Sequence, residues 1–247
     1  MEKNFKLTLS YDGTRWKGWQ RLKTTDNTIQ GKLEDLLSRL FGQPVEVTGA
    51  GRTDAGVHAA GQVANFHINT DMQAADLCRR LRHMLPPDIG LIQAEEVPAR
   101  FHSRLSALEK TYCYRVWNSE VPNVFLQRYT YQLPGPLNLE AMQAAAACFT
   151  GTHDFRAFCS GRYAEKSTTR TITRFTVERQ GDEIRMTVSG DGFLYNMVRI
   201  LAGTLLEIGQ GRRDTAEIPA LLESRTRSNA GETAPARGLC LMEVRYE

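Results

Sequence analysis

The sequence predicts an α+β protein with two tandem ferredoxin-like domains, each with the order β-α-β-β-α-β and an antiparallel sheet. Two observations carry this prediction. Strand-like alternation and helical spacing of apolar residues follow one another in that order over the first half of the chain, and the second half repeats the order. The length of 247 residues also fits two domains. We place these domains at residues 1–103 and 104–247.

In the first domain, apolar residues change from a period of two to helical spacing and back. Residues 5–9 alternate apolar and polar side chains, which predicts a half-buried strand. After a polar loop at 12–26, Asn27 and Gln30 resemble a capping pair, and Gly42 ends the helix that follows. The remaining expected elements are strands near 45–47 and 63–68, a helix over 77–85 stopped by two prolines, and a strand near 89–92.

The second domain shows the same succession of patterns. A strand is expected over 107–117 and an alanine-rich helix over 139–149. Two strands at 170–179 and 183–190 are separated by Gln-Gly-Asp, which predicts a hairpin. The chain is expected to close with an apolar helix over 195–208, a shorter helix over 214–224 and a strand over 239–246.

The composition is that of an ordinary globular protein. Hydrophobic residues make up 41% and charged residues 24%, which excludes a disordered chain, and the net charge of +3 excludes a polybasic arm. Arginine supplies 24 of the 31 cations. Its guanidinium suits phosphate recognition, although a GC-rich genome that favours arginine codons explains this bias equally well.

The cysteines and the N-terminus indicate the compartment. The five cysteines are odd in number and contain no CxxC pair, so neither a disulfide framework nor a zinc knuckle is supported. No apolar stretch follows the first charged residues, and no apolar run reaches the roughly 18 residues that a membrane helix needs. We therefore expect a soluble cytoplasmic protein with reduced thiols and no membrane segment.

The densest cluster of chemically useful residues lies in a glycine-rich stretch at 49–59. Three glycines in its first eight residues frame Arg52 and Asp54, and His58 follows. No helical pattern comes after this stretch, so it does not fit a phosphate-binding loop or a dinucleotide site. As a pattern of residue types, a structural turn in which Asp54 caps its own backbone explains it equally well. Asp54 and His58 could together ligate a metal, but a metal site is not supported, because no second His or Cys lies at ligand spacing.

As a sequence, the same stretch is more specific, because residues 51–59 (GRTDAGVHA) resemble the signature of the tRNA pseudouridine synthase A family. The resemblance covers nearly the whole chain in order. One departure is Trp16, which stands where a smaller aromatic residue is usual and affects loop packing. The other matching segments are 11–14 (YDGT), 18–20 (GWQ), 62–63 (QV) with Phe66, Pro86 with 88–89 (DI), 101–104 (FHSR), 110–114 (KTYCY), 166–168 (KST), 170–172 (RTI), 192–199 (GFLYNMVR), 234–236 (APA) and 238–239 (GL).

This resemblance implies an isomerase that needs no cofactor and no metal. Members of the family break the N-glycosidic bond of a uridine in tRNA, turn the base and rejoin it through carbon. The implied targets are uridines 38–40 of the anticodon stem-loop. The implied architecture is two α+β domains with a positively charged central cleft, assembled as a homodimer in which each tRNA contacts both subunits.

The resemblance also assigns roles to individual residues. Asp54 matches the essential carboxylate, which attacks the ribose or the base or assists glycal formation, and Arg199 matches the arginine that pairs with it across the cleft. Tyr112 matches the aromatic residue that stacks on the target base, and Arg52 fits a role at the displaced nucleotide. Without the resemblance, Arg199 would be a surface cation and Tyr112 one face of a strand. His58 is expected to be structural.

The sequence is also compatible with two other functions. A non-catalytic RNA-binding protein could use exposed aromatic residues of the sheet, such as Tyr112 and Tyr114, although binding alone needs no carboxylate facing phosphates. A paralogue of the same family could modify a different position of tRNA.

Overall fold

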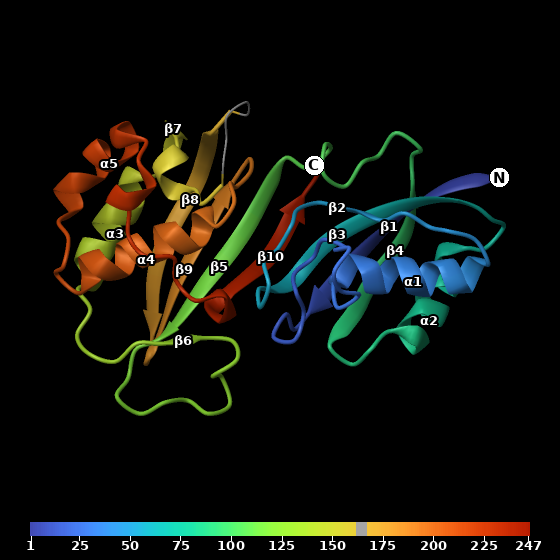
Figure 1. The fold of residues 1–247 in the computed structure, drawn as a ribbon, viewed down its shortest axis with the longest axis horizontal. Helices are drawn as coiled ribbons and strands as arrows, with labels where there is room; N and C mark the ends of the chain where they lie inside the picture. The colour runs from blue at the N-terminus through green and yellow to red at the C-terminus, as the bar shows by residue number, and fades with distance from the viewer. Residues whose placement is uncertain (162–166) are drawn as a thin grey trace. The chain divides into compact units, whose positions relative to one another are not determined.

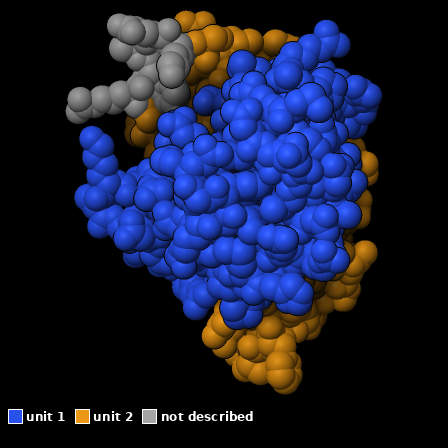
Figure 2. Space-filling model, turned by 90° about the vertical axis from the view of Figure 1, so that its right-hand side faces the viewer, with its two compact units in different colours: residues 1–108, 241–247 blue, residues 109–240 orange. Residues whose placement is uncertain are grey.

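The computed structural model describes residues 1–161 and 167–247, which form a mixed α+β fold with mostly antiparallel strand pairs (Figure 1). The predicted α+β class is therefore confirmed. The chain divides into two compact units, which Figure 2 distinguishes by colour. Unit 1 contains Met1–Leu108 and Leu241–Glu247, and unit 2 contains Glu109–Cys240. The border after residue 103 stays a prediction.

Unit 1 is an antiparallel sheet with two helices on one of its faces (Figure 1). The strand order is β4-β1-β3, and the short β2 also pairs with β3. The last part of β10, from Leu241, lies along the same edge of β3 as β2 and belongs to unit 1. The bounds are β1 (Glu2–Tyr11), α1 (Ile29–Phe41), β2 (Thr48–Gly49), β3 (His58–Asn69), α2 (Ala74–Met84), β4 (Ile89–Val97) and β10 (Leu239–Arg245).

The period-two pattern in β1 fills the core of unit 1. Phe5, Leu7 and Leu9 are completely buried on one face of the strand. The ring of Phe5 lies 5.6 Å from that of Phe66, its register partner on β3. Leucines at helical spacing on α1 are buried over the same face. The predicted strand and helix are both confirmed, because each buries the side chains that its period places together.

Two local predictions in unit 1 are wrong. The N-cap of α1 is Thr28, not Asn27: its extended backbone lets Oγ1 accept the N–H of Gly31 at 3.2 Å. The second strand, expected to begin at 45–47, begins only at Thr48 and is two residues long, although both valines are buried. The N–H of Val47 bonds a carboxylate oxygen of Glu34 on α1 at 3.2 Å, so this backbone is satisfied by a helix side chain instead of a neighbouring strand.

Unit 2 is a second mainly antiparallel sheet in the order β5-β9-β8-β7, with the short β6 parallel to β5. The helices α3, α4 and α5 lie together on one side of these strands (Figure 1). The hairpin between β8 and β9 is confirmed, with Gly181 at a φ of 59°. The bounds are β5 (Glu109–Trp117), β6 (Tyr131–Gln132), α3 (Leu139–Cys148), β7 (Gly151–Asp154), β8 (Thr169–Gln180), β9 (Glu183–Gly190), α4 (Met197–Gly209) and α5 (Ile218–Ser224).

Helix α4 is almost completely buried in unit 2. Every residue of this helix is buried except Arg199, which is half-buried. A Cβ at Gly203 would lie 1.8 Å from the carbonyl oxygen of Glu232, so the segment around 232 lies directly on the helix. The helix begins at Met197, two residues later than predicted, because Asn196 has a left-handed backbone. The strands β6 and β7 were not predicted, since two and four residues are too short to show a period.

Candidate active site

The glycine-rich stretch forms an ordered loop that joins β2 to β3 in unit 1. Within it, Thr53 is buried, Asp54 is half-buried and Arg52 is exposed. Gly56 has a φ of 80°, a left-handed conformation that only glycine adopts without cost. The turn is closed by a hydrogen bond of 3.1 Å from the N–H of Val57 to the carbonyl oxygen of Asp54. The loop therefore presents a carboxylate and a guanidinium two residues apart.

A second loop, residues 12–19, packs backbone to backbone against the first. A Cβ at Gly13 would lie 2.0 Å from the carbonyl oxygen of Val57, so only glycine fits there. Gly18, with a φ of 95°, approaches the carbonyl oxygen of Thr53 in the same way, and that oxygen accepts the N–H of Trp19 at 2.9 Å. The two glycines allow this approach, and the hydrogen bond fixes the backbone just before Asp54.

Beneath the loop, three polar side chains from β1, the loop and β3 form a buried network. The Tyr11 and Thr53 hydroxyl oxygens lie 2.8 Å apart. The amide nitrogen of Gln62 lies 3.3 Å from the Tyr11 hydroxyl and donates to the carbonyl oxygen of Gly51 at 3.0 Å. Two strands of the sheet thus hold the loop from below. The sequence places Tyr11 and Gln62 in matching segments, but gives no sign that they meet.

His58 stabilises the contact between the two loops. Its Nδ1 accepts the N–H of Gly13 at 3.0 Å and lies 3.3 Å from a carboxylate oxygen of Asp12. The imidazole therefore bridges the backbone of Gly13 and the side chain of Asp12. This arrangement supports the structural role expected for His58.

The unusual residue Trp16 is built into the second loop. Its ring is buried, and its Nε1 donates to a carboxylate oxygen of Asp88 at 2.9 Å. Arg15 also binds the Asp88 carboxylate through two nitrogens. The carbonyl oxygen of Trp16 accepts the N–H of Gly56 at 3.3 Å. The larger aromatic ring is thus accommodated, and it links Asp88 to the turn that follows Asp54.

In unit 2, Arg199 is held by two acceptors. Its Nε donates to the carbonyl oxygen of Ala234 at 2.7 Å, and its Nη1 donates to Oδ1 of Asn196 at 3.0 Å. The N–H of Ala234 donates in return to the carbonyl oxygen of Arg199 at 3.1 Å. Arg199 is therefore a half-buried and oriented cation, unlike a surface side chain with its head in water.

The two tyrosines of β5 differ in their surroundings. Tyr112 is 7% exposed, and its ring meets that of Phe193 edge to face at 5.2 Å. Tyr114 is completely buried, its hydroxyl donates to the carbonyl oxygen of Pro235 at 2.8 Å, and burial raises the pKa of this hydroxyl. Neither ring is exposed, so the expectation that Tyr112 and Tyr114 are exposed RNA-binding residues is wrong, although Tyr112 keeps a small accessible part.

The predicted site residues thus fall into two sets. Arg52 and Asp54 lie together on the loop of unit 1, while Tyr112 and Arg199 lie in unit 2. Tyr112 contacts Phe193 and Arg199 binds Asn196, and both of these partners belong to the segment 192–199. The pairing of Asp54 with Arg199 stays a prediction. Lys166, part of another matching segment, lies outside the described residues.

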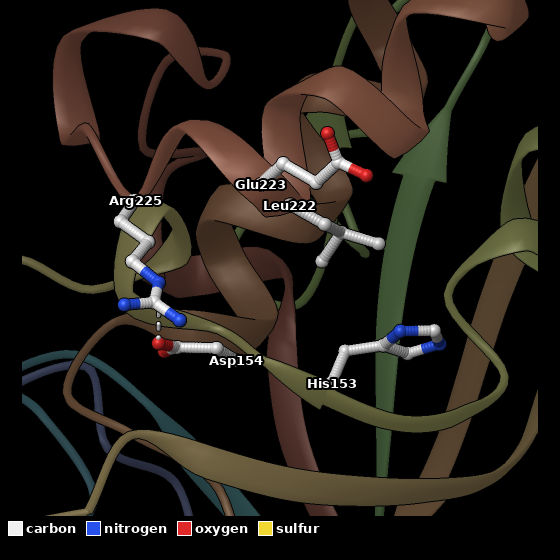
Figure 3. A pocket seen from close by; sticks show the side chains of 5 residues that line it. All are labelled: His153, Asp154, Leu222, Glu223 and Arg225. Carbon is white, nitrogen blue, oxygen red and sulfur yellow. Dashed lines mark ion pairs between the residues drawn. The ribbon is translucent and has the colours of Figure 1, made fainter.

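A separate hollow of about 380 Å³ lies in unit 2 between β7 and the end of α5 (Figure 3). Arg225 and Asp154 form an ion pair of 3.1 Å at its edge. Burial favours a higher pKa of Asp154, but hydrogen bonds from Thr168 and the Arg156 N–H, with the Arg225 charge, lower it. None of the predicted site residues lines this hollow, whose lining is His153, Asp154, Leu222, Glu223 and Arg225.

In residues 1–161 and 167–247, no group of three or more His, Cys, Asp or Glu side chains is arranged to hold a metal ion. No helix there is both long enough and apolar enough to cross a bilayer.

Comparison with known proteins gives similarity over the full length. A family model described as tRNA pseudouridine synthase matches residues 8–105 and 145–247. The chain is 46% identical to tRNA pseudouridine synthase A of Acetivibrio thermocellus, over 99% of this chain and 100% of that protein. It is 43% identical to tRNA pseudouridine synthase A 2 of Bacillus cereus, over 98% and 99%. A chain in a crystal structure of a Cbf5-Nop10-Gar1 complex is 13% identical, with a TM-score of 0.36, covering 86% of this chain and 44% of that one.

Proposed function

Because the chain belongs to the tRNA pseudouridine synthase family, we propose that it isomerises uridines 38–40 in the anticodon stem-loop of tRNA, with Asp54 as the essential carboxylate. The family and the relatives establish the enzyme class: an isomerase that converts uridine to pseudouridine in tRNA. The target positions and the roles of individual residues are the proposal. The observation that carries it is the ordered loop that holds Asp54.

The reaction needs one glycosidic bond to break and another to form. The bond between N1 of the base and C1′ of the ribose breaks, the base turns, and C5 bonds to C1′. The hydrogen on C5 leaves as a proton and N1 takes one up, so the product is an isomer of the substrate. A carboxylate can attack or stabilise the reacting carbon only while it is ionised.

The surroundings of Asp54 suit this task. Its neighbour Thr53 is anchored on both sides, by the Tyr11 hydroxyl and by the Trp19 N–H. The turn at Gly56 fixes the chain after it. A carboxylate on a loop held in this way loses little entropy when it meets the reacting atom, and such positioning lowers the barrier. Arg52, exposed on the same loop, is proposed to contact the displaced nucleotide.

Arg199 and Tyr112 are proposed to act on the same uridine as Asp54. An arginine next to a carboxylate keeps that carboxylate ionised near neutral pH. Arg199 suits this role because its guanidinium is half-buried and bound at two nitrogens. Tyr112 is proposed to stack on the target base, with Phe193 supporting its ring from the side.

The finer architecture and the assembly belong to the same proposal. We propose a ferredoxin-like topology for both domains, a central cleft, a homodimer whose tRNA contacts both subunits, and a cytoplasmic location. The order β4-β1-β3-β2 in unit 1, antiparallel throughout, supports this topology for that unit. In unit 2 the additional strands β6 and β7 extend the basic pattern.

One alternative is a paralogue that modifies another position of tRNA. The names of the similar proteins state no target position, so a measurement has to decide between the two. Pseudouridine mapping of bulk tRNA from a strain without this protein distinguishes the two. Loss at 38–40 supports the proposal, and loss at another position supports the alternative.

The role of Asp54 is tested by Asp54→Asn, which keeps the size of the side chain and removes its charge. We expect no isomerisation in a tritium-release assay, while the Kd for tRNA changes by less than about tenfold, or ~1.4 kcal/mol. The matched control is Asp71→Asn, an exposed carboxylate of unit 1 outside the loop, which should keep its rate. Turnover by Asp54→Asn would exclude the assignment.

A further inference from the structure

Asn196 has an unusual backbone at the start of α4. Its φ is 62° and its ψ is 3°, which is the left-handed region. Within the described residues, Asn196 and Arg225 are the two non-glycine residues with a positive φ. Such a conformation is strained for a residue with a Cβ, and asparagine tolerates it better than most residues do. A residue kept in this state indicates a local requirement.

The side chain of Asn196 is also used in an unusual way. An asparagine before a helix ordinarily has an extended backbone, and its oxygen accepts the N–H two or three residues ahead. Asn196 makes no such cap. Its Oδ1 instead accepts Nη1 of Arg199 at 3.0 Å, while its carbonyl oxygen accepts the N–H of Ile200 at 3.0 Å. The left-handed backbone of Asn196 therefore directs its side chain to the Arg199 guanidinium and not to the backbone N–H groups at the start of the helix.

The second acceptor of the guanidinium is equally fixed. The Ala234 carbonyl that accepts Nε belongs to a segment bound along α4. The N–H of Gly231 donates to the Thr204 hydroxyl at 3.0 Å, and the N–H of Glu232 donates to a carboxylate oxygen of Glu207 at 2.9 Å. Two fixed acceptors on two different nitrogens determine both the position and the rotation of a planar guanidinium.

We propose that Asn196 is a positioning residue, which directs the guanidinium of Arg199 through its left-handed backbone together with its Oδ1. This inference rests on the proposed function, since it assumes that Arg199 takes part in the reaction. Asparagine combines two properties that most residues lack. Glycine adopts the same backbone but offers no acceptor, whereas aspartate offers both.

These differences define the variants. Asn196→Gly keeps the backbone and removes the acceptor, so we expect the single-turnover rate to fall about tenfold, the size of one hydrogen bond to a charged group. The Kd for unmodified tRNA should stay within about twofold, because binding spreads over many phosphate contacts. Asn196→Asp should recover most of the rate. The melting temperature of Asn196→Gly should not fall, since glycine removes the backbone strain.

The deciding measurement is a double-mutant cycle with Arg199→Met. If Asn196 acts through Arg199, Asn196→Gly should cause no further loss of rate in the Arg199→Met background. An equal loss in both backgrounds, or a full rate for Asn196→Gly while Arg199→Met is slow, would overturn the inference and leave the proposed function intact. A full rate for Arg199→Met would refute both the role of Arg199 and the inference that depends on it.

Arg225 provides the matched control. It has the same left-handed backbone, with a φ of 52°, at the end of α5, and its side chain is engaged with Asp154 beside the hollow in Figure 3. Arg225→Gly tests what a glycine does at such a position in the same unit. Its single-turnover rate should match that of the unchanged protein. A loss as large as that of Asn196→Gly would show that glycine acts through general flexibility, which overturns the inference.

Discussion

The hydroxyl oxygens of Tyr11 and Thr53 lie 2.8 Å apart, and Thr53 directly precedes Asp54, the proposed catalytic carboxylate. Tyr11 is the last residue of a central strand, so this hydrogen bond joins the rigid part of unit 1 to the loop that carries Asp54. Side chains held by such a contact are better positioned than those on an unattached loop. The sheet therefore contributes directly to the geometry of the proposed site.

Removal of the Tyr11 hydroxyl should weaken catalysis more than binding. Tyr11→Phe keeps the ring and loses the hydroxyl contacts with Thr53 and Gln62, which should cost about 1–2 kcal/mol of unfolding free energy. We expect a lower kcat with little change in KM, because loop order matters most in the transition state. Tyr246→Phe is the control, since that hydroxyl bonds the Ser103 carbonyl at 2.7 Å in the same unit, away from the loop. Equal effects on kcat in both variants would contradict this prediction.

Trp16→Phe should destabilise unit 1. Phenylalanine keeps a buried aromatic ring but cannot donate to Asp88, so one charge-assisted hydrogen bond is lost. We expect a decrease of about 2 kcal/mol in the free energy of unfolding, measured by urea denaturation. Thr14→Ala removes another polar contact of the same loop, to Asp12 on its exposed side, and should cost less. An unchanged urea midpoint for Trp16→Phe would show that the bond to Asp88 contributes nothing.

Glu183 should make the stability of unit 2 depend on pH. Burial favours a higher pKa, but hydrogen bonds from Arg115 and Arg185 lower the pKa of Glu183 from 4.5 to about 2. Because the folded pKa lies below the unfolded one, the stabilisation is complete above about pH 4.5 and is lost as the pH falls toward about 2. Glu183→Gln should therefore cost about 2 kcal/mol at pH 7. The difference from the unchanged protein should shrink toward pH 3.

The experiment is urea unfolding of both proteins at several pH values. Glu178→Gln, at a neighbouring position on β8, is the control, because its side chain is exposed to solvent. It should change the free energy of unfolding less than Glu183→Gln does at pH 7. A difference between Glu183→Gln and the unchanged protein that stays constant from pH 7 to pH 3 would contradict the prediction.

Binding of tRNA should depend strongly on salt. For a nucleic-acid substrate, the logarithm of affinity falls with the logarithm of salt concentration, with a slope near −0.7 to −0.9 per phosphate neutralised. If Arg52 contacts a phosphate of the displaced nucleotide, Arg52→Gln should reduce the slope by about one. Arg39→Gln, exposed on the last turn of α1, is the control. A flat response between about 50 and 200 mM salt would argue against a nucleic-acid substrate.

The sequence predicted the strands and helices that bury one face and expose the other, because their apolar residues then recur with a regular period. In β1, alternation of Phe5, Leu7 and Leu9 follows from one buried face, and this signal is local. The N-cap at Thr28 and the late start of β2, after Val47, were not predictable in this way. In each case the outcome depends on a hydrogen bond to a specific side chain or turn, which propensity does not contain.

The site shows the same division. The family resemblance selects Asp54 and Arg199 as residues, but their supports come from elsewhere in the chain. Nothing in the spacing of the sequence indicates that Gly13 touches the backbone of Val57, or that Asn196 turns its side chain to Arg199. Contacts of this kind arise from backbone conformations that are set by the folded neighbours. The residues could be selected from sequence, whereas their orientation required the structure.

Residues 241–247 belong to unit 1, although they are synthesised after all of unit 2. Tyr246 bonds the Ser103 carbonyl, and Met242 lies against Gly61 of β3. Proteins are synthesised from the N-terminus and begin to fold during synthesis. One edge of β3 therefore stays incomplete while the ribosome translates all of unit 2. Residues 241–247 can pair there only after they leave the exit tunnel, so translation that stops before them leaves the first unit unfinished.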